Sequence, residues 1–186
     1  RRSHKKPGPR APQPRQMARM ENSRLLSALK AAEQQQLLSQ SLMYRYGPGE
    51  LVVQEGDPGD CLYQIISGQV AVIKNFGTPE QLQVCLLSSG EIFGEMTLLL
   101  DAPRSATIQI VEEAELLRID RRSLQPLLEA NPSLLNELAQ EAEHRKRELE
   151  ELGIISATDQ RTNLLSTMRR LFESLTETMS PSSEVR

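Results

Sequence analysis

The chain has 186 residues, enough for one domain of ordinary size with flanking segments. Its formal net charge is −3, but residues 1–15 carry six of the 22 Lys and Arg side chains and none of the 25 acidic ones, so the remainder has 16 basic against 25 acidic side chains, or about −9. An acidic surface is a poor match for nucleic acid, and we expect no nucleic-acid partner. Nowhere do 18 apolar residues follow one another, so the sequence predicts no membrane-spanning helix.

Two segments precede the central part of the chain. Residues 1–16 hold four prolines, one glycine and six cationic side chains, a composition that predicts a flexible, basic, proline-rich linker. A tether attracted to anionic lipid or to a neighbouring acidic domain is the alternative interpretation. Residues 17–41 lack proline and glycine and predict an N-terminal helical segment of one or two helices. Its leucines follow a helical spacing: Leu25, Leu26, Leu29, Leu37 and Leu38.

Residues 42–120 change to a pattern typical of β-strands. Eight of the ten glycines lie between Gly47 and Gly94, at turn-like intervals. Between the turns lie short runs rich in Val, Ile, Leu and Tyr. We expect strands at 51–54, 61–66, 69–74, 82–87, 105–111 and 115–119. Many short strands with Gly and Pro turns predict a mainly β fold with flanking helices, in the form of an antiparallel jelly-roll β-barrel.

Residues 121–153 are expected to form hinge and lid helices, beginning with a short helix over 123–129. Asn131 and Pro132 then mark a second helix start, because an amide side chain can cap a helix and proline favours the first helical position. This longer helix should run from Pro132 to about Leu152, with Gly153 as its stop, since glycine commonly follows the last helical residue.

One stretch inside the β region, residues 93–107, has the pattern of an anion site. Gly94 has no Cβ, so the backbone there can turn sharply and approach a ligand closely. The apolar run 96–100 is long enough for about one helical turn, whose free N–H groups favour an anion. Arg104 can close on the same anion through a two-pronged contact, and Glu95 suits a ribose hydroxyl as an acceptor. The pattern indicates a pocket for a sugar phosphate.

This stretch resembles the phosphate-binding cassette of cyclic-nucleotide-binding domains, the family of the cAMP receptors and cyclic-nucleotide-gated channels. The resemblance covers roughly residues 25–152 and rests on a joint pattern of motifs. These are Phe93-Gly94-Glu95-Met96, Pro103-Arg104-Ser105-Ala106-Thr107, Gly47-Pro48-Gly49-Glu50, Gly56-Asp57-Pro58-Gly59-Asp60, Leu62-Tyr63 and Ser67-Gly68-Gln69-Val70.

The resemblance implies that Arg104 holds the cyclic phosphate and that Glu95 accepts a hydrogen bond from the ribose 2′-OH. Thr97 departs from the small Ala often found at its position, and little functional change is expected from it. Ser105 occupies the position that helps family members to discriminate cAMP from cGMP, and we expect cAMP, with cGMP as the alternative. The implied ligand-binding residues are Phe93, Gly94, Glu95, Met96, Thr97, Arg104, Ser105, Ala106 and Arg145.

Arg145 stands out on the predicted long helix, because it is the one charged side chain in an otherwise apolar stripe. Its stem could simply cover apolar surface. By resemblance, an Arg on the final helix stacks over the purine as a lid, a contact that suits a planar guanidinium. The stripe could equally be a short dimer seam, and we expect a homo-oligomer. The stripe comprises Leu135, Leu138, Ala142, Arg145, Leu149 and Leu152.

The sequence offers no recognisable catalytic site. No nucleophile and base stand in a familiar context, and no cluster of metal ligands is evident, because His4 and His144 lie far in sequence from both cysteines. Cys61 and Cys85 are flanked by apolar residues and are expected to be buried, reduced thiols. We therefore expect a sensor, with neither enzyme activity nor a metal.

Residues 154–186 predict an amphipathic helix over 162–175 and a tail. The run 164–172 resembles the end of bacterial mechanosensitive-type channels that carry a cyclic-nucleotide-binding domain at their C-terminus. We therefore expect the cytoplasmic ligand-binding domain of a membrane channel. The alternative is the regulatory domain of a transporter, enzyme or kinase. A transcription regulator lacking its DNA-binding part is less favoured, because the segment after Gly153 shows no basic recognition pattern.

Overall fold

The computed structural model describes residues 8, 10–12, 23–100 and 102–151. Most of the expected linker 1–16, the start of the segment 17–41 and the whole of 154–186, with its expected helix, lie outside these residues. Within the described part of the N-terminal segment, the backbone of Arg10 forms an isolated antiparallel bridge with Met43. None of the described helices is long and apolar enough to cross a membrane.

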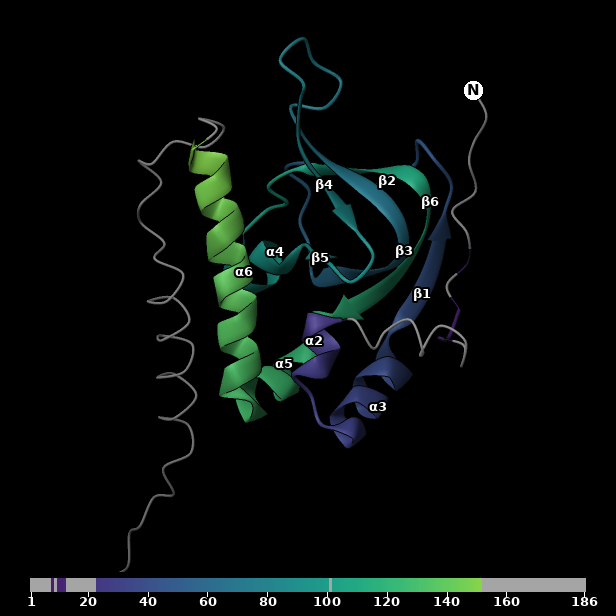
Figure 1. The fold of residues 1–186 in the computed structure, drawn as a ribbon, viewed down its shortest axis with the longest axis vertical. Coiled ribbons are helices and arrows are strands. Elements are labelled where there is room, and N and C mark those ends of the chain that lie inside the picture. The colour runs from purple at the N-terminus through teal and green to yellow at the C-terminus, as the bar shows by residue number, and fades with distance from the viewer. Residues whose placement is uncertain (1–7, 9, 13–22, 101, 152–186) are drawn as a thin grey trace, which may run out of the picture.

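Six strands form one antiparallel sheet that curls into a roll (Figure 1). Its main order is β1-β6-β3-β4, with β2 paired to β6 and β5 paired to β3. The prediction of a mainly β, jelly-roll-like fold with flanking helices is confirmed. The strands are β1 (Leu42–Tyr46), β2 (Leu51–Val53), β3 (Cys61–Lys74), β4 (Leu82–Ser88), β5 (Ile92–Phe93) and β6 (Thr107–Asp120).

Two long strands differ from the prediction, which divided each of them into two. β3 continues through Ser67 and Gly68, and β6 continues through 112–114, with register shifts where the two strands pair. Gly68 has φ 87°, and a Cβ there would overlap the carbonyl oxygen of Glu113. A Ser-Gly pair reads as a turn in the sequence, but here it makes a bulge that bends one continuous strand.

In the part of the chain that the structure describes, five helices flank the roll. α2, α3 and α5 gather below the sheet in Figure 1, and α6 runs beside it with α4 in between. The cassette helix α4 forms where it was predicted, and α6 begins at Pro132 as predicted. The helices are α2 (Arg24–Ser27), α3 (Ala31–Gln40), α4 (Glu95–Leu100), α5 (Arg121–Ala130) and α6 (Pro132–Glu151).

The buried apolar residues form two clusters. One fills the inside of the roll and includes Phe93, Ile108 and Leu116. The other joins the helices to the outer side of the sheet, where Leu98 and Leu99 of α4 share a cluster with residues of α2, α3, α5 and α6. The cassette helix is therefore packed against the helical layer and not only against the sheet.

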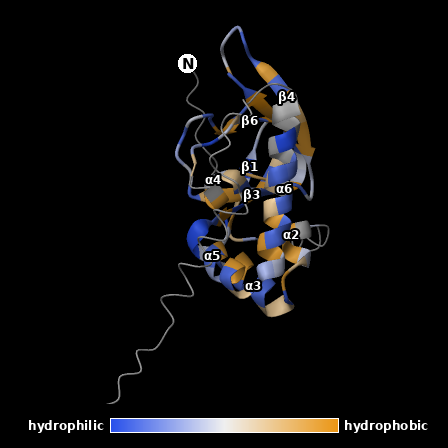
Figure 2. Cartoon of the chain, turned by 90° about the vertical axis from the view of Figure 1, so that its left-hand side faces the viewer, coloured by the Kyte–Doolittle hydropathy of each residue, from blue (hydrophilic) through white to orange (hydrophobic). Residues whose placement is uncertain are grey.

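The described half of the α6 stripe faces into the protein. Leu138 is 3% exposed and Ala142 is fully buried, and Leu135 packs against the same cluster. Figure 2 shows hydrophilic and hydrophobic residues alternating along α6, as expected of a helix with one face on a core. This half of the stripe is used within the chain, so a dimer seam would have to involve other residues.

A polar contact joins the N-terminal helices to the junction of α5 and α6. Asn131 Nδ2 donates to Glu33 Oε1 at 3.0 Å, and the Lys30 backbone N–H donates to Glu33 Oε2 at 2.9 Å. These two hydrogen bonds, that from Asn131 first, hold the pKa of Glu33 below its ordinary value of 4.5. The carboxylate form of Glu33 is thus favoured by the folded state.

We predict that this contact makes stability depend on pH. Because the folded-state pKa is lowered, the contribution of Glu33 is fully present above about 4.5 and is lost as the pH falls through the folded value. Thermal unfolding of Glu33→Gln and the unaltered chain between pH 7 and pH 3.5 should give melting temperatures that differ at neutral pH and converge in acid. A difference that stays constant over this range would contradict the assignment.

Candidate functional site

One pocket lies at the cassette, and eight of the nine residues predicted to bind ligand line it. The empty space between its atoms is about 620 Å³, including the part open to solvent. The structure thus brings these residues together, while their contacts with a ligand stay a prediction. They are Phe93, Gly94, Glu95, Met96, Thr97, Arg104, Ser105 and Ala106.

Arg104 is the buried cation of this pocket, with only 5% of its surface exposed. Its Nη2 donates to Cys61 Sγ at 3.2 Å, and its Nη1 lies 3.4 Å from the Gly94 carbonyl oxygen. The salt bridges among the described residues do not include Arg104. Burying a guanidinium is costly unless an opposite charge compensates it. A buried Arg that lines a pocket and takes part in none of these salt bridges is therefore suited to receive an anion.

Two glycines leave the space that Arg104 occupies. A Cβ on Gly59 would lie 2.5 Å from Arg104 Nε, and a Cβ on Gly94 would overlap Nη1. The Arg104 backbone is also held, because its N–H donates to the Asp57 carbonyl and its own carbonyl accepts from the Gly56 N–H, each at 2.8 Å. The turn 56–60 therefore holds the Arg104 backbone and leaves room for its guanidinium.

The cassette helix begins at Glu95, directly after Gly94, which has φ 83°. Glu95 and Thr97 are each 2% exposed, so both polar side chains are held inside the site. The first turn of a helix has N–H groups without intrahelical partners. The other side of α4 is tied to α5, because Arg121 Nη2 donates to the Thr97 carbonyl at 3.3 Å. The helix can thus offer donors to the pocket while its position depends on α5.

The rest of the pocket wall is apolar and was not found from the sequence. It comes from β2, β3, β4 and β6, and its position beside the cassette suits a flat, largely apolar group such as a purine. Alternating apolar residues marked these strands in the sequence, but alternation does not tell which face points into a pocket. The wall residues are Val53, Val72, Val84, Cys85, Leu87 and Ile108.

The two cysteines have different surroundings. Both are free thiols, as expected. Cys61 is buried and accepts from Arg104, whereas Cys85 is only half-buried and lines the pocket. The expectation that both are simply buried is therefore wrong for Cys85, which reaches the pocket because β4 forms its wall.

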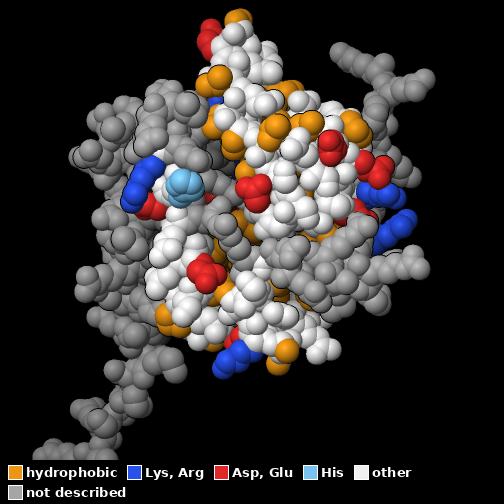
Figure 3. Space-filling view, viewed as in Figure 1, with side chains coloured by type: hydrophobic (Ala, Val, Ile, Leu, Met, Phe, Trp, Pro, Cys, Tyr) orange, Lys and Arg blue, Asp and Glu red, His pale blue; other side chains and the backbone are white. Residues whose placement is uncertain are grey.

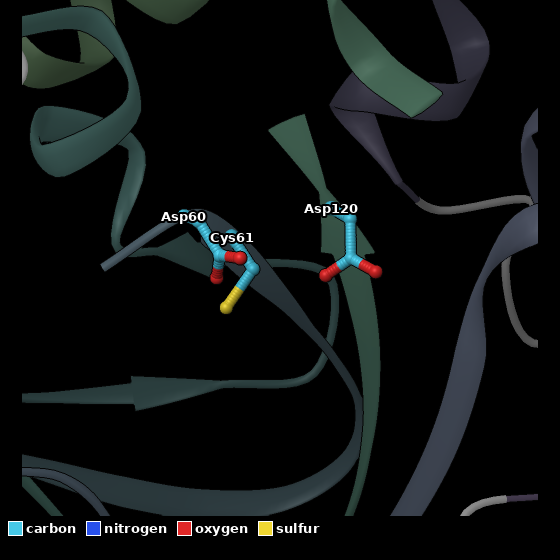
Figure 4. A group of neighbouring side chains, drawn as sticks. All are labelled: Asp60, Cys61 and Asp120. Atoms are coloured by element: carbon cyan, nitrogen blue, oxygen red, sulfur yellow. The ribbon is translucent and has the colours of Figure 1, made fainter. Parts of the chain in front are cut away.

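Cys61 also belongs to the one cluster of candidate metal ligands among the described residues, together with Asp60 and Asp120 (Figure 4). A cation already lies between the carboxylates, because Arg118 Nη2 is 3.2 Å from Asp60 Oδ1 and 2.8 Å from Asp120 Oδ1. Burial lowers the pKa of Arg118, but the hydrogen bond to Cys61 and the charge of Asp120 outweigh it and raise the pKa. The guanidinium takes the place that a metal ion would need.

The outer surface of the sheet carries exposed hydrophobic side chains, and Figure 3 shows hydrophobic groups over its upper part in this view. Leu82 and Leu86 of β4 are 46% and 43% exposed. β4 also contributes Val84, Cys85 and Leu87 to the pocket. This strand therefore presents apolar side chains both to the pocket and to solvent.

The ninth predicted residue, Arg145, lies on α6, but its side chain is outside the part of the chain that the structure describes. Its contact with a base stays a prediction. The described residues of α6 that approach the cassette are those of its buried face, through their cluster with Leu98 and Leu99.

Comparison with known proteins identifies the family of this chain. The family model described as "Cyclic nucleotide-binding domain" matches residues 44–131. The chain is 31% identical over 153 residues to the cyclic AMP receptor protein of Thermus thermophilus, covering 82% of this chain and 71% of that protein. It is 30% identical over 109 residues, 59% of this chain, to a cAMP-dependent protein kinase regulatory subunit of Hypocrea atroviridis.

Among solved structures, cAMP-bound PfPKA-R is similar over 75% of this chain, with 26% identity and a TM-score of 0.66. The fraction of the other protein that the chain covers differs from one relative to the next. The chain spans 71% of the Thermus receptor protein, but only 22% of the Hypocrea regulatory subunit and 46% of the PfPKA-R chain. The similarity therefore concerns one domain that occurs in proteins of different size.

Proposed function

Because the chain belongs to the cyclic nucleotide-binding domain family, we propose that its pocket binds cAMP and that the bound nucleotide regulates an effector. The observation that carries the proposal is Arg104, a buried guanidinium that lines the pocket and belongs to none of the salt bridges seen between described residues. A cyclic phosphate supplies the single negative charge that this position lacks. Relatives named for cAMP support cAMP as the ligand, and relatives that are cGMP-dependent protein kinases keep cGMP as the alternative.

Each part of the nucleotide then has a matching part of the pocket. The phosphate binds to Arg104 and to N–H groups at the start of α4. The ribose 2′-OH donates to Glu95, whose side chain is held inside the site. The base lies against the apolar wall formed by the strands, including Val72 and Leu87.

Binding is transmitted through α4. Leu98 and Leu99 pack in the same cluster as Leu134 and Leu138 of α6, so a shift of α4 on binding changes what α6 packs against. The ligand can bias two arrangements of α6 only by its difference in affinity for them, and a ~100-fold difference supplies ~2.7 kcal/mol. The helical layer is therefore the output of the domain.

The regulated effector is proposed from the flanking segments. The basic, proline-rich start and the channel-like run 164–172 favour a membrane channel with this domain on its cytoplasmic side. Regulation of a kinase is the second candidate, because relatives include kinase regulatory subunits. In either case the domain senses a nucleotide and does not transform it.

Isothermal titration with cAMP, cGMP and 5′-AMP tests the ligand. We expect micromolar or tighter binding of cAMP, weaker binding of cGMP, and little binding of 5′-AMP, whose phosphate is not cyclic. Failure of both cyclic nucleotides to bind would overturn the proposed function, and cGMP ahead of cAMP would overturn the choice of ligand.

The lid prediction is tested by Arg145→Ala. If the guanidinium stacks on the base, the variant should bind cAMP a few-fold more weakly, because an exposed cation–π contact contributes only ~0.5–1 kcal/mol. Titration measures this change, and sedimentation of both proteins measures their oligomeric state. An altered oligomer with unchanged affinity would assign Arg145 to a subunit contact instead.

A further inference from the structure

A group of polar contacts outside the pocket holds the end of the cassette. Lys74, the last residue of β3, donates from Nζ to the Ser105 carbonyl oxygen at 2.7 Å and forms a salt bridge with Glu55. The side chains of Lys74 and Glu55 are 13% and 28% exposed. Because both are largely shielded from solvent, this pair is less screened than a surface ion pair.

Glu55 is itself held by two further hydrogen bonds. Its backbone N–H donates to Thr107 Oγ1 at 3.0 Å, and its Oε2 accepts from the Asn75 N–H at 2.8 Å. Thr107 is 2% exposed. The contacts join three segments that are distant in sequence: the turn after β2, the end of β3 and the exit of the cassette. We call this group the Glu55–Lys74 clamp.

The clamp fixes one peptide plane of the pocket from outside. Neither Lys74 nor Glu55 lines the pocket, whereas Ser105 and Ala106 both do. In a trans peptide the carbonyl and the following N–H point in opposite directions. The hydrogen bond from Lys74 to the Ser105 carbonyl therefore also orients the Ala106 N–H. Both residues directly follow Arg104 in the chain.

We propose that Lys74 is a positioning residue for nucleotide binding, which acts by fixing the Ser105–Ala106 peptide without touching the ligand. The expected effect on nucleotide affinity rests on the proposed function. The effect on the orientation of the Ser105–Ala106 peptide does not, because Lys74 holds this peptide in the unliganded protein as well. Glu55 supports Lys74 by orienting its ammonium group. A salt bridge with a purely structural role would change stability and leave the affinity as it is.

The test uses the full chain and the double variant Glu55→Gln/Lys74→Met, which removes the clamp without leaving a shielded carboxylate unpaired. In the unliganded protein, hydrogen exchange at the Ala106 amide, followed by NMR, should be faster than in the unaltered chain. Titration should show cAMP binding about 10-fold weaker, the size expected if the misaligned Ala106 N–H no longer donates one hydrogen bond to the charged phosphate. The single variant Lys74→Arg can still donate to the Ser105 carbonyl and pair with Glu55. It should therefore keep the exchange rate of the Ala106 amide and the cAMP affinity of the unaltered chain.

Arg45→Met is the matched control. Arg45 also pairs with a carboxylate, Glu113, at 2.7 Å, but the two side chains are 66% and 62% exposed and neither lines the pocket. This variant should leave both readouts unchanged. Unchanged Ala106 exchange in the double variant would overturn the proposal, and so would unchanged affinity with lowered stability. If the unaltered chain binds no cyclic nucleotide, the proposed function fails, and the exchange readout alone decides whether the clamp orients the peptide.

Discussion

Arg104→Ala should abolish most nucleotide binding while leaving the unliganded protein as stable as before or more stable. Removing one partner of a buried, hydrogen-bonded charge pair costs about 2–5 kcal/mol, or roughly 30-fold to several thousand-fold in affinity. In the unliganded protein the substitution should not lower stability, because the salt bridges between described residues leave the desolvation of the buried guanidinium uncompensated. Titration with cAMP measures the first effect and thermal unfolding without ligand the second.

Arg104→Lys separates charge from geometry at the same position. Lysine keeps the positive charge but cannot make the two-pronged contact of a guanidinium, so its affinity should fall between those of Arg104→Ala and the unaltered chain. Arg45→Ala, which removes an exposed Arg far from the pocket wall, is the control and should bind normally. Unchanged affinity in Arg104→Ala would remove the phosphate site from this pocket.

Gly59→Ala should weaken cAMP binding about 10-fold or more without a large loss of stability. The added Cβ would lie 2.5 Å from Arg104 Nε and 2.6 Å from Cζ, so something must move. The end of a flexible Arg side chain moves more readily than backbone, and the guanidinium should shift out of its position. Loss of one hydrogen bond to a charged group, ~1.5–3 kcal/mol, accounts for an effect of this size.

Gly47→Ala is the matched control for this substitution. Its Cβ would meet only Glu50 Oε2, at 3.7 Å, which is an ordinary contact. Both glycines lie outside the left-handed backbone region, so neither exchange strains φ. Normal binding in Gly59→Ala would show that Arg104 reaches the ligand from another position, and a severe loss of stability would show that the turn 56–60 cannot yield.

The fold and the centre of the site could be read from local sequence. The cassette lies within residues 93–107, so the spacing of Gly94, Glu95 and Arg104 along the chain already brings them to one place. The signal for the helix start at Pro132 was equally local, because helix capping and the fixed φ of proline involve only a few neighbouring residues. Signals of this kind depend on neighbours in the chain, and the structure confirms the elements they predicted.

Other features depended on strands that meet only in the folded protein. Gly59 and Cys61 lie far from Arg104 in sequence, yet Gly59 leaves room for its guanidinium and Cys61 accepts a hydrogen bond from it, because the turn before β3 packs against the end of the cassette. The bulge at Gly68 turned two predicted strands into one, since a Ser-Gly pair fits a turn and a bulge equally well.

The sequence by itself determined where the candidate anion site lies, because a sharp glycine turn, a short helix and an Arg stand together in one short stretch. Only the tertiary structure decided what surrounds them: the apolar wall that includes Val72, the place of Arg104 outside the salt bridges between described residues, and the support of Ser105 by Lys74. The physical reason is the two-residue period of a strand. Which of its faces lines a pocket depends on register and bulges set by long-range pairing, and no local signal carries that information.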